Sequence, residues 1–132
     1  MNQVIIGVGS NISPYAHIDE ARRMLARDHR FEKTTLLTRT KPIGYANQPD
    51  FINCAFLVNT SLERPEFRHY LKTLENRLGR KRTSNKNGPR TIDLDIAAWN
   101  GKIVDKNYYD RSFLRNAVDK LMEQSTGVDI CR

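Results

Sequence analysis

The segment Ile92–Ile96, with sequence IDLDI, constrains the fold of this chain more than any other stretch. Three apolar residues alternate with Asp93 and Asp95, which is the period of a half-buried β-strand. Both carboxylates therefore leave the same face of the strand, with Cα atoms about 6.5 Å apart. The pair would repel, and one or two divalent cations would remove that repulsion. Such strands also occur at sheet edges with a solvated polar face, so this pattern alone leaves both interpretations open.

Arginines gather just before this strand, at Arg80, Arg82 and Arg90. Their planar guanidinium groups stay charged and bind phosphate oxygens in pairs. Arginines beside metal-binding carboxylates are what phosphoryl transfer needs, because that chemistry depends mainly on positioning and on neutralising charge. The basic run Arg80–Lys86 is also compatible with a solvated loop that attracts anions without catalysis.

Size and composition bound the class of protein. The chain has 132 residues, so we predict one domain over residues 1–132. The sequence has no apolar run of membrane-spanning length and no signal-like start, so we expect a cytoplasmic protein without membrane partners. The formal net charge of +7 indicates polyanionic partners. We expect a monomer, with an oligomer left open.

Periodicity and turn residues predict an α+β fold. The predicted elements, in chain order, are a strand at Val4–Val8, a helix from the cap Ser13 to about Arg27, strands at Thr34–Thr40 and Phe51–Asn59, a helix from residues 62–65 to Gly79, the strand that continues to Trp99, a hairpin at Asn100–Gly101, and a short last helix from about Phe113. This order predicts a ferredoxin-like βαββαβ antiparallel sheet with the first two helices on one face, plus a C-terminal hairpin arm and short helix.

Within the predicted third strand, Phe51 and Asn53 share one parity. A ring beside a carboxamide can stack on and hydrogen-bond a flat heterocycle, although most such neighbours have no such role. His17 and His29 have no partners at metal-ligand spacing, so we expect them at the surface.

Several motifs occur together and in a characteristic order: GSN at residues 9–11, QPDFIN at 48–53, Glu75 followed by GRKR at 79–82, and GPRTIDLDI at 88–96. With these motifs the chain resembles the 6-hydroxymethyl-7,8-dihydropterin pyrophosphokinase family, over nearly all of residues 4–99. The resemblance implies transfer of diphosphate from ATP to the hydroxymethyl group of the pterin, with release of AMP, in folate biosynthesis.

The resemblance also implies residue roles. Two Mg²⁺ ions would be held by Asp93 and Asp95, and ATP would be the co-substrate. The catalytic residues would be Arg80, Arg82, Asp93 and Asp95. The pterin would contact Thr40, Pro42, Ile43, Phe51, Asn53 and Phe113, and the nucleotide would contact Glu75, Arg80, Arg82, Arg90, Ile96 and Arg111.

The chain also departs from the family pattern. The arm after the Asp strand is shorter, and it carries Tyr108-Tyr109-Asp110 where the family has a stretch with histidine. Two alternatives follow. A diverged paralogue could bind a pterin or nucleotide, or act on another alcohol. An RNA-binding module would suit the positive charge, but the aromatic motif expected on a central strand is missing, so nucleic acid is not the expected partner.

Overall fold

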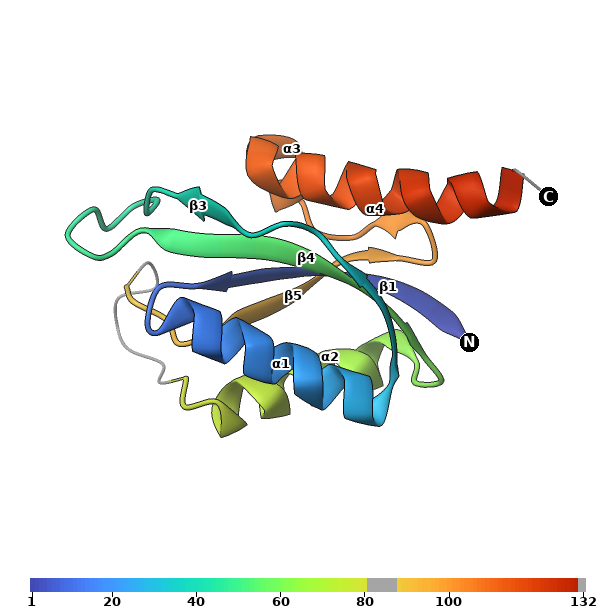
Figure 1. Cartoon of the computed structure of the whole chain (residues 1–132), viewed down its shortest axis with the longest axis horizontal. Coiled ribbons are helices and arrows are strands. Elements are labelled where there is room, and N and C mark those ends of the chain that lie inside the picture. Colours follow the sequence, from blue (N-terminus) through green and yellow to red (C-terminus); the bar gives the residue numbers. More distant parts are fainter. Residues whose placement is uncertain (81–87, 131–132) are drawn as a thin grey trace.

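A computed structural model describes residues 1–80 and 88–130 of the chain (Figure 1). Its elements are β1 (Asn2–Ser10), α1 (Pro14–Asp28), β2 (Arg30–Thr34), β3 (Thr38–Thr40), β4 (Phe51–Thr60), α2 (Arg64–Arg77), β5 (Asp93–Trp99), β6 (Lys102–Ile103), α3 (Asn107–Asp110) and α4 (Ser112–Ile130). The antiparallel sheet has the order β2-β4-β1-β5-β6, with β3 paired to β4. This confirms the predicted ferredoxin-like α+β arrangement.

The helices α1 and α2 cover one face of the sheet (Figure 1). Spacings of three and four residues place the apolar side chains of each helix on one stripe. The stripes are buried against alternate residues of the central strands: Ile18, Ala21 and Leu25 from α1, Phe67, Leu71 and Leu74 from α2, and Val4, Ile6, Val8, Phe56 and Val58 from the sheet.

The opposite face of the sheet is covered by α4, which is longer than the short last helix that we predicted (Figure 1). Leu114, Val118 and Leu121 form its buried stripe. They pack on a second core cluster that contains Ile5, Ala55 and Leu57. Strand β1 contributes side chains to both cores, which is typical of a continuous apolar run covered on both faces.

The predicted strand Thr34–Thr40 is wrong, because the structure has two short strands there with a break between them. At the break, Thr35 bonds to Ala55 of β4 through its backbone N–H and its hydroxyl Oγ1, so a side chain replaces part of the ladder. Ser13 was predicted to cap α1 through its side chain. It instead adopts a left-handed backbone conformation at φ 42° without that hydrogen bond, and Pro14 begins the helix.

The prediction that His29 lies at the surface is also wrong. His29 is half-buried between the end of α1 and α2, with its ring at the edges of Phe67 and Tyr70 at centroid distances of 5.2 and 4.5 Å. Its Nε2 atom is buried, and no described residue forms a hydrogen bond with it. Burial favours the neutral imidazole, so it lowers the pKa of His29, while the neighbouring Asp28 acts in the opposite direction.

The predicted hairpin is confirmed, with Asn100 and Gly101 at φ 49° and 83° between β5 and β6. Close to it, β5 contains a bulge. Ala98 pairs with Ile5 and Ile96 pairs with Ile6, so Ala97 is the extra residue. Among the described helices, none combines the length and the apolar character that crossing a membrane requires.

Candidate active site

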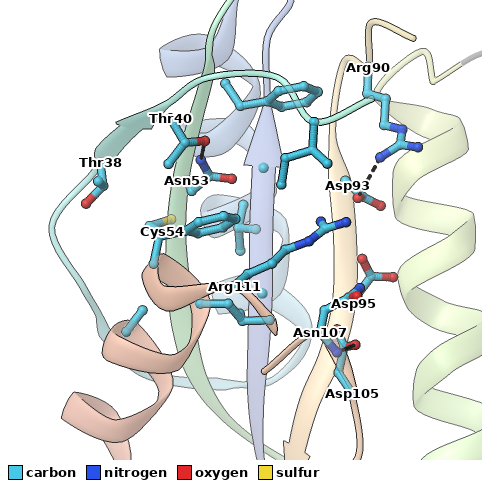
Figure 2. A pocket seen from close by; sticks show the side chains of 18 of the residues that line it. Thr38, Thr40, Asn53, Cys54, Arg90, Asp93, Asp95, Asp105, Asn107 and Arg111 are labelled. Atoms are coloured by element: carbon cyan, nitrogen blue, oxygen red, sulfur yellow. Dashed lines mark hydrogen bonds and ion pairs between the residues drawn. The ribbon is translucent and has the colours of Figure 1, made fainter. Parts of the chain in front are cut away.

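An open cavity of about 370 Å³ lies on the α4 side of the sheet, next to the first turn of α4 (Figure 2). Its size is in the range of small-molecule sites. Ten of the residues expected at the site line this cavity: Thr40, Ile43, Phe51, Asn53, Arg80, Arg90, Asp93, Asp95, Arg111 and Phe113. The floor is formed by Gly7 and Gly9 of β1.

Strand register explains why these residues meet. Gly9 pairs with Asn53 of β4 on one side and with Asp93 of β5 on the other. Asn53 and Asp93 therefore lie two strand spacings apart, about 10 Å, across a floor that has no side chain. In the next row Gly7 pairs with Asp95, so both carboxylates rise from the same face as predicted. The sheet thus places a carboxamide and an acidic pair on opposite sides of one glycine strip.

On the acidic side, arginines hold Asp93. Nη1 of Arg80 is 3.0 Å from Oδ1 of Asp93, and Nη1 of Arg90 is 3.3 Å from Oδ2 (Figure 2 draws the Arg90 contact). Two guanidinium groups therefore converge beside one carboxylate at the cavity wall. Arg80 and Arg90 therefore lie against the acidic strand at the same cavity.

Glu75 of α2 holds Arg80 and strand β5 in place from the buried side of the cavity wall. Its side chain is fully buried. Its Oε2 atom accepts the backbone N–H of Leu94 at 2.7 Å and is 2.9 Å from Nη1 of Arg80. The same Arg80 nitrogen thus bridges Glu75 and Asp93, which fixes α2 to β5 and orients the guanidinium at the edge of the cavity.

Asp95 stands one row further along β5, and this residue is exposed in the open cavity. The protein that surrounds this part of the cavity nevertheless desolvates the carboxylate, and the negative charges of Asp93, Glu75 and Asp105 act in the same direction. Together they raise the pKa of Asp95 to about 7, with Lys72 opposing them. The second carboxylate is therefore electrostatically destabilised where the first is neutralised by arginines.

On the opposite side, Asn53 donates from Nδ2 to the hydroxyl of Thr40 at 2.6 Å (Figure 2). This bond orients the amide so that Oδ1 lies over Gly9, where an added Cβ would come within 3.0 Å of it. The ring of Phe51 borders the same spot. An acceptor and an aromatic ring thus flank an open patch of floor, as a flat polar heterocycle requires.

The connection between α3 and α4 supplies the third wall. Arg111 extends from it across the cavity toward Asp95, and Phe113 lines the cavity close by (Figure 2). In the described part of the chain, the Arg111 side chain has no ion pair or hydrogen bond. A cation directed into an open cavity can bind an anionic ligand.

Asn11 joins the separate motifs, a role that we did not predict. Its Oδ1 accepts the backbone N–H of Arg90 at 2.8 Å, and its Nδ2 donates to Oε1 of Gln48 and to the carbonyl of Pro49 at 2.8 and 3.0 Å. One carboxamide therefore ties the loops before β4 and β5 to the end of β1. The only signal in the sequence is a polar residue directly after a buried strand.

Not every expected residue lies at the cavity. Pro42 is outside its lining, and Ile96 packs against the core on the α1/α2 side. Arg82 lies outside the described residues. The cavity lining also includes polar residues that sequence reasoning missed, among them Lys72, Asp105 and Asn107. Lys72 lies one turn before Glu75 on α2, a spacing that could have revealed it.

The fold and the cavity define a class: a ferredoxin-like α+β protein whose sheet presents an acidic pair with arginines, opposite a carboxamide and an aromatic ring, in one cavity. Residues 5–123 match the family described as 7,8-dihydro-6-hydroxymethylpterin-pyrophosphokinase (HPPK). The chain belongs to this family.

Curated relatives agree with this assignment. The chain is 33% identical over 110 residues to the 2-amino-4-hydroxy-6-hydroxymethyldihydropteridine pyrophosphokinase of Helicobacter pylori, covering 80% of this chain and 68% of that protein. It is 30% identical over 134 residues to the Bacillus subtilis protein of the same name, covering 93% and 80%. It is also 34% identical over 104 residues to the folic acid synthesis protein FOL1 of Dictyostelium discoideum. The aligned residues cover 78% of this chain but 16% of that longer protein.

Proposed function

We propose that this protein transfers diphosphate from ATP to the hydroxymethyl group of 6-hydroxymethyl-7,8-dihydropterin and releases AMP, a step of folate synthesis. Family membership supports the reaction class. The observation that supports the proposal is the register around Gly9, which holds Asn53 and Asp93 about 10 Å apart in one cavity, so that the pterin would lie on the Asn53 side and the phosphates on the Asp93 side.

On the ring-binding side, Phe51 and Phe113 would enclose the flat pterin. Oδ1 of Asn53 would accept a hydrogen bond from an N–H at the edge of the ring, since Thr40 already holds the other end of the amide. We assign Thr40, Pro42 and Ile43 to the rim of this pocket. The rings would exclude water, which would otherwise compete with the pterin hydroxyl as nucleophile.

On the phosphate-binding side, Arg80, Arg90 and Arg111 would bind the triphosphate, and we keep Arg82 with them as a prediction. Carboxylate oxygens are the ligands that Mg²⁺ prefers, and Asp93 and Asp95 offer them from the same face, so the residues fit the two expected ions. When bound, the ions would supply charge neutralisation across the phosphates. The protein residues would align the hydroxyl oxygen with the β-phosphorus. As the bond between the hydroxyl oxygen and the β-phosphorus forms, the bond from the β-phosphorus to the bridging oxygen of AMP breaks. The hydroxyl proton leaves to solvent.

The direct test is to incubate the protein with the reduced pterin alcohol, ATP and Mg²⁺ and to quantify AMP. Asp95→Asn should lower pterin-dependent AMP formation by at least about 100-fold while it keeps the fold, because it removes an anionic ligand next to the triphosphate. Glu123→Gln, an exposed change on α4 outside the cavity, is the control and should keep full activity. Unchanged turnover in Asp95→Asn would contradict the role of Asp95.

A protein that binds the pterin but forms no AMP would instead be a diverged paralogue. The observation that favours this second candidate is the short connection at α3, which occupies the place of the longer arm. Calorimetry with the pterin alone should show binding for both candidates, so the AMP assay separates them, because only the first candidate predicts AMP formation.

A further inference from the structure

Asp105 and Asn107 form a polar pair at the end of the cavity that none of the roles above explains. The bulge in β5 holds their backbone in place. The carbonyl of the bulged Ala97 accepts the N–H groups of Val104 and Asp105 at 2.9 and 3.4 Å. Bulges next to active sites commonly re-aim a side chain, and here the segment after β6 is drawn against β5 so that Asp105 lies beside Asp95 (Figure 2).

The side chains of this pair are available to a ligand. Oδ1 of Asp105 accepts the backbone N–H of Asn107 at 2.9 Å, which fixes the orientation of the carboxylate. In the described part of the chain, no hydrogen bond or ion pair engages the other carboxylate oxygen or the carboxamide of Asn107. Both side chains are half-buried and line the cavity. One acceptor and one amide are therefore held ready at a fixed place.

The chemistry of the pair limits what it can bind. An ionised carboxylate only accepts hydrogen bonds and repels phosphate, so this end of the cavity does not suit the triphosphate. The proposed function assigns both expected cations to Asp93 and Asp95, which leaves the Asp105 and Asn107 pair to another kind of ligand. The suitable ligand is a neutral group with donors. A vicinal diol is such a group, and acidic residues bind the ribose hydroxyl in dinucleotide sites for the same reason.

The position of the pair points to the nucleotide. Asn53 and Thr40 lie on one side of the cavity and the acidic strand on the other, with Asp105 and Asn107 beyond Asp95 and farthest from the ring-binding side (Figure 2). A nucleotide whose reacting phosphates lie between Asp93 and Arg111 would extend its nucleoside away from the pterin. The ribose would then reach this end of the cavity.

We propose that Asp105 and Asn107 bind the ribose hydroxyls of the nucleoside triphosphate, so that the protein selects ribonucleotides over deoxyribonucleotides. This inference rests on the proposed function. It adds a residue pair that determines which nucleotide is accepted, apart from the residues that bind phosphate or pterin.

The test compares the binding of MgATP, its 2′-deoxy analogue and its 3′-deoxy analogue by calorimetry without pterin, so that no turnover occurs. For the unaltered protein we expect at least one deoxy analogue to bind about tenfold or more weakly, the size typical of a hydrogen bond to a charged group. Asp105→Asn should reduce the difference to within about threefold. The amide oxygen of the substituted side chain can still accept the backbone N–H of Asn107. The amide NH₂ group, a donor, then lies where the second carboxylate oxygen, an acceptor, was.

Two further variants make the result decisive. Asn107→Ala removes the carboxamide, keeps the backbone bond to Asp105, and should also narrow the preference. Glu123→Gln changes charge equally on exposed α4 surface and should leave the preference unchanged. Equal binding of all three nucleotides by the unaltered protein, or a preference that persists in both cavity variants, would overturn the inference, while AMP formation in the pterin assay would still support the proposed function. If MgATP does not bind and no AMP forms, both are overturned.

Discussion

The buried carboxylate of Glu75 gives the sharpest stability prediction. Replacing it with alanine leaves the N–H of Leu94 without the acceptor that it has at 2.7 Å, in a region without solvent. An unsatisfied buried donor costs about 1–3 kcal/mol. Breaking a buried ion pair costs about 3–5 kcal/mol. Because Arg80 keeps its contact with Asp93 at 3.0 Å, we expect the loss of its contact with Glu75 to cost about the lower value of that range. Because the two losses share one carboxylate, we expect Glu75→Ala to reduce the free energy of unfolding by about 3 kcal/mol in total.

Glu75→Gln separates the two contributions. The amide oxygen can still accept the Leu94 N–H, so only the charge opposite Arg80 is lost and we expect a cost of about 1–2 kcal/mol. Urea unfolding followed by circular dichroism measures both variants. With a slope of about 1.5 kcal/mol per molar urea, Glu75→Ala should shift the midpoint by about 2 M.

The matched control is Glu20→Gln, an exposed position on α1 that should change stability by less than about 0.5 kcal/mol. If Glu75→Ala costs no more than this control, Glu75 does not connect α2 to β5 as described. A double-mutant cycle with Arg80→Ala adds a second check. The structure requires a coupling energy between the two positions, since they share a contact at 2.9 Å.

Two more predictions concern the cavity floor and the half-buried histidine. Gly9→Ala should weaken pterin binding by about tenfold, because its Cβ would lie 3.0 Å from Oδ1 of Asn53 and displace that acceptor; calorimetry should show unchanged MgATP binding, and an unaltered pterin affinity would argue against the role of Asn53. His29 should make stability depend on pH. Its folded pKa lies below 6.5, so the unfolded chain takes up the proton first and stability falls as pH drops below about 6.5. His29→Gln should flatten this dependence between pH 7.5 and 5.5, whereas the exposed control His69→Gln should not; equal slopes in both variants would refute the assignment.

The central strands could be predicted because their apolar patterns are clear and the element order admits few topologies. Once β1 is placed between β4 and β5, the parities of Asn53 and Asp93 already require them to face the same side. The acidic pair was therefore predictable from local sequence, and its position opposite Asn53 from topology. The cavity-lining residues of β4 and β5 therefore follow from a two-residue period and the strand order.

Other features depend on contacts that leave no periodic signal. The break between β2 and β3 arises because the hydroxyl of Thr35 competes with the backbone for Ala55. The bulge at Ala97 is set by pairing with Ile5 and Ile6, and it positions Asp105. His29 is half-buried only because Phe67 and Tyr70 approach from a helix distant in sequence. Tertiary contacts decided each of these cases, and local propensity could not.

The same face of β1 serves as core and as cavity floor, and side-chain size separates the two uses. Ile5, Gly7 and Gly9 lie on the face of β1 that is turned toward α4. Only Ile5 has a side chain that the helix can cover. At Gly7 a Cβ would lie 3.1 Å from Cδ1 of Leu114, so the first turn of α4 already touches the backbone of the floor there. The N-terminus of α4 lies at this contact, so the helix does not cover Gly9. The sheet is therefore open between Asn53 and Asp93. The glycines therefore determine where packing stops and where a ligand can lie against the sheet.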